Sequence, residues 1–145
     1  MTDGVFPAWA IWALLSACFA ALTAILAKVG VADVNSDMAT LIRTGVIFVL
    51  LIGIVLTSGE RLSSSSIAPN TWLFLVLSGL ATGASWLCYF RALKLGPASQ
   101  VAPLDKLSVV LVAVFGVAFL GERLSATNWV GIALITGGVL LVAFK

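Results

Sequence analysis

The stretch Thr40–Ser58 reads TLIRTGVIFVLLIGIVLTS, 19 residues in which Arg43 carries the single charge. A membrane-spanning helix needs about 20 largely apolar residues, whereas a spanning strand is about half as long and alternates in polarity. This stretch has the length of the helix and lacks the alternation of the strand. It therefore predicts a transmembrane helix.

Four further runs of the chain have the same apolar character, and they cover residues 9–27, 72–90, 99–120 and 128–144. Over all 145 residues, 61% are apolar, 10% are charged and the mean hydropathy is +1.17. A soluble domain carries about 25% charged residues, so this chain lacks the polar atoms to cover its own surface in water. The sequence predicts an all-α, polytopic membrane protein, with one five-helix domain over residues 1–145 whose second helix covers 40–58.

The composition excludes several classes of chemistry. The chain has no His, two Cys and a net charge of +2. Zinc sites, Ser-His-Asp triads and haem ligation need side chains that it lacks, and the phosphate-binding motif GxxxxGK[ST] is absent. We expect no enzyme activity, no cofactor, no metal and no nucleic-acid partner. Cys18 and Cys88 are expected to be reduced packing residues. The leader Met1–Gly4 carries no Lys or Arg, which favours no signal cleavage.

The basic residues flanking the predicted helices indicate an orientation. Five spans place the termini on opposite sides of the membrane. The C-terminal side holds Lys28, Arg91, Lys94 and Lys145, and the other side holds Arg61 and Arg123. Because Lys and Arg are enriched in cytoplasmic loops, this predicts an outside N-terminus and a cytoplasmic C-terminus in the cytoplasmic (inner) membrane. The small excess leaves dual topology as an alternative.

Three charged residues lie inside predicted spans: Arg43, Asp105 and Lys106. Such charges are costly, and each indicates a functional site by default. Arg43 lies about one turn into its helix and the other two about two turns into theirs from the same side, so all three could meet. Asp105 is the only carboxylate within a predicted span, which makes it the candidate proton carrier or counter-ion. The alternative is a structural Arg43–Asp105 pair, with Lys106 extending to the headgroups.

Pro103 lies within the predicted helix 99–120. Since it has no N–H to donate to the Ser99 carbonyl, it predicts a bend two residues before Asp105. Broken helices near charged residues occur at transporter binding sites, although Pro also serves architecture in spanning helices.

Polar side chains form a stripe along the predicted helix 72–90. The stripe comprises Ser78, Thr82, Ser85 and Tyr89, with Trp86 one position away. These side chains could line a substrate path or form ordinary interhelical hydrogen bonds. The full set of candidate substrate or coupling residues is Arg43, Thr82, Ser85, Trp86, Tyr89, Asp105, Lys106 and Ser108.

The ends of the helices carry recognisable capping chemistry. Asn35, Ser36 or Asp37 could cap the second helix, and Ser125 is expected to cap the fifth. Gly96, just before a proline, suits a left-handed position at the end of the third.

Three segments carry a resemblance to a known family: YFRALKLGPAS at 89–99, LGERL at 120–124 and GIALITGGV at 131–139. They resemble the EamA family of the drug/metabolite transporter superfamily, most strongly over residues 86–144 and extending over essentially the whole chain. Typical members have ten spans in two inverted five-span repeats, of which this sequence resembles one. The resemblance implies that two chains assemble, as a homodimer that is antiparallel if the topology is dual. Glu122 would be structural, and the charges at 105–106 depart from the family pattern.

The leading hypothesis is a secondary transporter that moves a small organic solute by alternating access as a dimer, with a proton gradient acting through Asp105 as the candidate energy source. One alternative is a non-transporting membrane scaffold subunit. Another is an exchanger like the small multidrug-resistance proteins, which calls for a carboxylate in the middle of the first span. That span has Ser16 and Thr23 instead.

Overall fold

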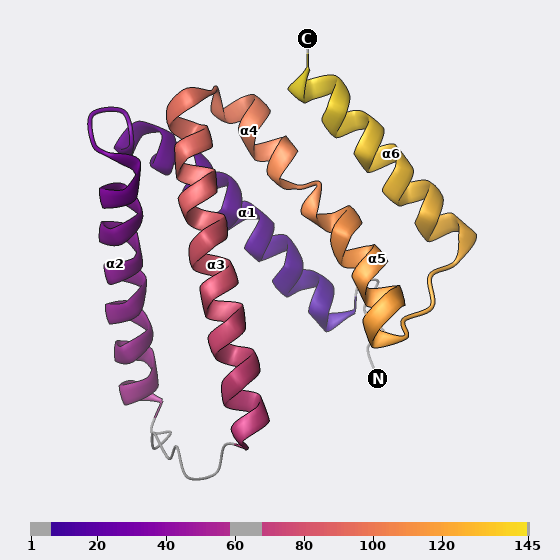
Figure 1. Ribbon diagram of the computed structural model, residues 1–145, viewed down its shortest axis with the longest axis horizontal. Coiled ribbons are helices and arrows are strands. Elements are labelled where there is room, and N and C mark those ends of the chain that lie inside the picture. The colour runs from indigo at the N-terminus through magenta and orange to yellow at the C-terminus, as the bar shows by residue number, and fades with distance from the viewer. Residues whose placement is uncertain (1–6, 59–67, 145) are drawn as a thin grey trace. The chain divides into compact units, whose positions relative to one another are not determined.

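The computed structural model describes residues 7–58 and 68–144, which form six helices (Figure 1). The helices are α1 (Ala8–Gly30), α2 (Ser36–Thr57), α3 (Pro69–Leu95), α4 (Ala98–Asp105), α5 (Ser108–Leu120) and α6 (Ala126–Ala143). The predicted serine-rich loop with Arg61, and Lys145 at the C-terminus, lie outside the described residues.

Five candidate membrane spans account for these helices, because α4 and α5 together form the one span Ala98–Leu120. Each span has between 18 and 27 residues. The described chain is therefore all-helical with five long apolar helices, as the sequence predicts. The second helix begins at Ser36, four residues earlier than predicted, because Asn35 caps it: the Asn35 Oδ1 accepts the Asp37 N–H at 2.8 Å.

The helices belong to two compact units, Met1–Lys28 with Gly96–Lys145 and, separately, Val29–Leu95. In the Val29–Leu95 unit, α2 and α3 lie side by side and pack along each other (Figure 1). In the other unit, α6 packs against both α4 and α5. That these units form the single domain expected from the sequence stays a prediction.

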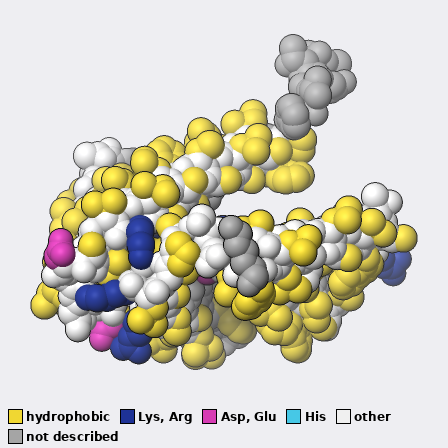
Figure 2. All heavy atoms as spheres, turned by 90° about the horizontal axis from the view of Figure 1, so that it is seen from above, with side chains coloured by type: hydrophobic (Ala, Val, Ile, Leu, Met, Phe, Trp, Pro, Cys, Tyr) yellow, Lys and Arg dark blue, Asp and Glu magenta, His cyan; other side chains and the backbone are white. Residues whose placement is uncertain are grey.

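Side chains of the described helices point mostly outward. The buried hydrophobic residues are Ala24, Val31, Phe90, Leu93 and Val139. Hydrophobic side chains cover most of the face seen in Figure 2. In lipid no hydrophobic force drives helices together, so a membrane protein can leave such a surface to the acyl chains. Cys18 and Cys88 are free but exposed, so the structure does not place them in a packed interior.

The turn between α5 and α6 is fixed by its backbone. Gly121 has φ +68°, and its N–H and the Glu122 N–H both bond the Gly116 carbonyl, the latter at 3.1 Å. Ser125 caps α6 as predicted, since its hydroxyl oxygen accepts the Asn128 N–H at 3.2 Å in a reciprocal capping box.

The left-handed position predicted for Gly96 is wrong, because Gly121 is the described glycine with positive φ. The residue before a proline is pushed toward extended backbone, and Pro97 follows Gly96. The Gly96 carbonyl accepts the Lys28 Nζ at 2.9 Å within the same unit.

Candidate functional site

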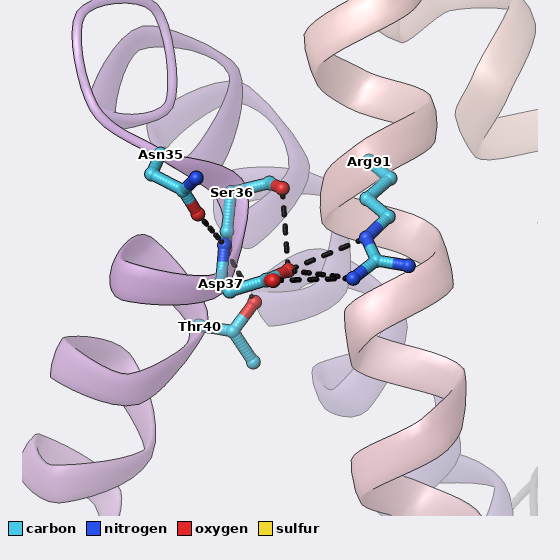
Figure 3. Close-up of polar contacts among 5 residues, drawn as sticks. All are labelled: Asn35, Ser36, Asp37, Thr40 and Arg91. Atoms are coloured by element: carbon cyan, nitrogen blue, oxygen red, sulfur yellow. Dashed lines mark hydrogen bonds and ion pairs between the residues drawn. The ribbon is translucent and has the colours of Figure 1, made fainter.

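The end of the α2/α3 pair is joined by an ion pair between Asp37 and Arg91 (Figure 3). Asp37 lies in the first turn of α2, where its own amide is bound by the Asn35 cap and its carboxylate faces α3. Arg91 Nε donates to Asp37 Oδ1 at 3.3 Å, and Arg91 Nη2 donates to Oδ1 at 3.2 Å and Oδ2 at 3.1 Å. The forked contact joins α2 and α3 at this end.

Lys94 adds a second basic contact at the same end. Its Nζ donates to the Val34 carbonyl at 2.6 Å, in the segment that leads into α2. Thr40, a buried polar residue of α2, donates its hydroxyl back to the Ser36 carbonyl at 2.8 Å. The Thr40 hydroxyl therefore donates its hydrogen bond within its own helix and not to a neighbouring helix.

Farther into the span, Arg43 of α2 lies on aromatic rings of α3. Its guanidinium carbon is 4.2 Å from the centroid of the Trp86 ring and 5.5 Å from that of Phe90. A guanidinium this close to a ring face is attracted by the ring quadrupole. Phe90 is buried and meets Tyr89 edge-on, with centroids 6.4 Å apart. The Arg43 side chain is half-buried, so it remains open on part of its surface.

These contacts follow one antiparallel register. Moving into α2 from Val34 through Asp37 to Arg43, the partners step back along α3 from Lys94 through Arg91 to Trp86. We call this line of contacts the α2/α3 seam. It carries three basic side chains. Lys94 binds a backbone carbonyl, Arg91 binds a carboxylate, and Arg43 stacks on aromatic rings.

The other unit holds a charged pair at the end of α4. Lys106 Nζ lies 3.2 Å from Asp105 Oδ2, and both side chains are more than a third exposed. The helix is interrupted here, because Lys106 and Leu107 donate their amides to Pro103 and Leu104, at 2.9 and 3.1 Å. These are bonds to the third preceding residue, so the backbone tightens into a 3₁₀-like turn before α5 begins.

The interruption of the α-helical hydrogen bonding lies just beyond Pro103, and a bend at Pro103 itself stays a prediction. Pro103 is inside α4, and the interruption comes at Lys106 and Leu107 rather than two residues before Asp105. The proline ring obstructs the turn that precedes it, whereas the backbone here departs from the α pattern in the turn that follows.

The candidate residues from the sequence divide between the two units. Arg43 and Trp86 are in direct contact, and Tyr89 lies beside Phe90. Thr82 donates its hydroxyl to the Ser78 carbonyl at 2.9 Å, and Ser85 is exposed. Asp105 and Lys106 bind each other, and Ser108 begins α5. Arg43 and Asp105 belong to different units, so their pairing stays a prediction.

Sequence reasoning missed the role of Asp37. The second helix was predicted to begin at residue 40, which put Asp37 outside it and left Asp105 as the only carboxylate in a span, but Asp37 lies within the candidate span Ser36–Thr57. The signal was present in the capping sequence, because Asn35 as cap puts Asp37 two residues on, in the first turn of α2. Arg91, counted only for topology, is its partner.

Comparison with known proteins identifies the family. The sequence model described as "EamA-like transporter family" matches residues 7–144, so the chain belongs to that family. It is 65% identical over 135 residues to the "Uncharacterized transporter in cobO 3'region" of Sinorhizobium sp, covering 93% of this chain and 96% of the relative. No solved structure matches the chain.

More distant relatives differ in length. The chain is 26% identical to the "Uncharacterized transporter YxxF" of Bacillus subtilis (strain 168), over 93% of this chain but 42% of that protein. It is 28% identical to the "Probable 4-amino-4-deoxy-L-arabinose-phosphoundecaprenol flippase subunit ArnE" of Hamiltonella defensa subsp. Acyrthosiphon pisum (strain 5AT), over 64% of this chain and 91% of that protein. Relatives of this chain thus include proteins of about its own length and longer ones.

Proposed function

We propose that this member of the EamA-like transporter family is a secondary transporter of a small organic solute, working by alternating access in a dimer. Family membership makes it a multi-pass membrane transporter, and the five candidate spans agree with that. The solute class, the dimer, the coupling and the orientation, with the C-terminus cytoplasmic in the inner membrane or with dual topology, are the proposed parts.

The observation that carries the mechanism is the interrupted fourth span. The span Ala98–Leu120 is broken at Lys106 and Leu107, and Asp105 and Lys106 lie at the break. An uninterrupted helix keeps its amides and carbonyls bonded to each other, whereas a break with charges beside it offers polar groups to a solute or ion. Transporters commonly bind their cargo at such discontinuous helices.

Asp105 is the residue that would couple transport to protons. Its carboxylate lies in a candidate span next to a helix break, 3.2 Å from Lys106 Nζ. A coupling group must gain and lose a proton as it faces alternate sides of the membrane. Asp37, the other carboxylate found within a candidate span, lies in the first turn of its helix and accepts three hydrogen bonds from Arg91, whereas Asp105 lies at a helix break.

The dimer is proposed from the length of the relatives. This chain spans 42% of YxxF, so that transporter holds more than twice the sequence that one copy of this chain supplies. Two copies of a five-span chain would rebuild the ten-span architecture that the family resemblance implies.

A second candidate is a subunit that works with a different partner. The ArnE relatives are named flippase subunits, and this chain covers 91% of one of them. In that case purified protein alone would not transport, and a co-expressed partner would be needed. An exchanger of cationic drugs is disfavoured because the first span, Trp9–Gly30, holds no carboxylate among its residues.

The test is reconstitution of the purified chain into liposomes, with a panel of radiolabelled organic solutes assayed by counterflow at uniform pH. Saturable counterflow by the chain alone supports the proposal. If the chain alone shows no counterflow for any solute, and a second purified protein restores counterflow, the subunit alternative is supported.

A further inference from the structure

The two arginines of the α2/α3 seam are held in different ways. Arg91 directs its N–H groups at the Asp37 carboxylate, with three hydrogen bonds of 3.1 to 3.3 Å. Arg43 lies on Trp86 and Phe90 instead. Among the described residues, 7–58 and 68–144, the ion pairs are Arg91–Asp37 and Lys106–Asp105. Within these residues, Arg43 is therefore the seam arginine that has no carboxylate partner.

Stacking on the two rings does not use the N–H donors of the Arg43 guanidinium. A guanidinium carries five N–H donors in its plane, while a ring face attracts it through its flat side. The rings thus orient the group and limit its rotation, and the donors at its edge stay open to an acceptor. The half-buried side chain leaves room for that acceptor to approach.

The position of Arg43 inside a span favours a polar or anionic partner. Arg43 lies seven residues beyond Ser36, roughly 10 Å along a helix whose 22 residues span about 33 Å, close to the thickness of the hydrocarbon core. A free Arg could extend toward the headgroups. Here Trp86 holds it 4.2 Å from its ring centroid, nine residues before α3 ends at Leu95. A charge kept inside a span needs a polar or anionic partner.

We propose that Arg43, oriented by Trp86 and Phe90, binds the carboxylate or phosphate group of the transported solute, so that the substrates are organic anions. Both groups accept two parallel hydrogen bonds from one guanidinium, a short and strong arrangement. The inference rests on the proposed function and names its substrate class. A cationic drug would meet an uncompensated positive charge at this place.

The experiment uses the full chain in nanodiscs of phosphatidylcholine. Benzoate and inorganic phosphate serve as anionic probes and tetraphenylphosphonium as a cationic one, with ligand-induced thermal stabilisation and titrated dissociation constants as readouts. Arg43→Gln is expected to weaken anion binding about tenfold to a hundredfold, the range for losing hydrogen bonds to a charged group. Arg43→Lys, which keeps the charge but loses the planar fork, should fall between.

Arg123→Gln is the matched control, because it removes the same charge from an exposed position in the turn between α5 and α6, outside the α2/α3 seam. It is expected to leave the dissociation constants within about twofold. Equal weakening by both variants would mean that net charge alone attracts the anion, and it would overturn the site. Circular dichroism and size-exclusion profiles identify variants that fail to fold, and Trp86→Phe, which keeps a ring, then provides a milder perturbation.

Further arms separate the anion sources and the two proposals. Nanodiscs containing phosphatidylglycerol test a lipid phosphate: its retention by the wild type but not by Arg43→Gln overturns the assignment to a solute. Failure of the wild type to bind either anion, or tighter binding of tetraphenylphosphonium, also overturns it. If anions bind in a way that depends on Arg43 but no counterflow is measured, transport is refuted and the site is kept. Counterflow of anions that Arg43→Gln leaves intact refutes the site but keeps transport.

Discussion

Replacing Gly121 by Ala should destabilise the protein through the backbone alone. Gly121 ends α5 with φ +68° and ψ +20°, a left-handed conformation. A Cβ there would meet nothing within 4 Å, so no side-chain clash contributes. For an L-residue this conformation costs roughly 1–2 kcal/mol, which a less flexible unfolded chain offsets in part. We expect a net loss of about 1 kcal/mol in the free energy of unfolding.

Gly137→Ala is the internal control for this prediction. Gly137 lies inside α6, a Cβ there would also have nothing within 4 Å, and its φ is not positive. In a helix interior, Ala is favoured over Gly by roughly 0.5–1 kcal/mol. The two variants thus make the same chemical change in equally open space, and they should differ by about 1.5–2 kcal/mol with opposite signs.

The measurement is reversible unfolding in mixed detergent micelles with increasing dodecyl sulfate, followed by circular dichroism. Gly121→Asn provides a graded third point, since Asn tolerates the left-handed region better than Ala does. Stability should fall in the order Gly, Asn, Ala at position 121. Equal stabilities for the variants Gly121→Ala and Gly137→Ala would refute the argument that the turn demands its glycine.

Four other outcomes are expected. Ser125→Ala should lower the free energy of unfolding by about 1 kcal/mol in the same assay, because it removes the α6 cap. Asp105→Asn should abolish the response of solute uptake to an imposed pH gradient while counterflow at uniform pH persists; an intact response excludes this residue as the proton site. If Arg43 and Asp105 pair, their double variant should lose less stability than the two single losses added together, whereas strictly additive losses would show that they do not touch. Impermeant thiol reagents on Ala32→Cys and Arg123→Cys, in a cysteine-free background, should each label from both sides if the dimer is antiparallel, and from one side only if the topology is single.

Local chemistry accounts for the parts of the structure that the sequence predicted well. The five spans follow from length and hydropathy, since a run such as Thr40–Ser58 has few other ways to satisfy its backbone in lipid. Ser125 could be identified as a cap because the capping interaction spans three residues. The family could be recognised because its signature is a local pattern around residues 89–99 and 120–139.

The candidate site could be predicted only in part, because its geometry depends on how neighbouring helices meet. The sequence identified Arg43 as a costly charge in a span and Trp86 as a nearby candidate, but nothing in their spacing indicated that one stacks on the other. The Arg43–Asp105 pair was predicted because both residues lie at similar depths in their spans. Depth does not determine how each helix is rotated, so it does not show which side chains face each other. Asp37 fell outside the predicted second helix because that helix begins four residues before the apolar run.

What the sequence by itself determined is therefore the membrane environment, the five spans and the family, all of which depend on residues close together along the chain. The tertiary structure decided the register of α2 against α3, in which Asp37 meets Arg91 and Arg43 meets Trp86. It also decided that the fourth span breaks after Asp105, where amides bond the third preceding carbonyl. Apolar helix surfaces in lipid are nearly equivalent in every rotation, so a few polar and aromatic contacts select the face that is used.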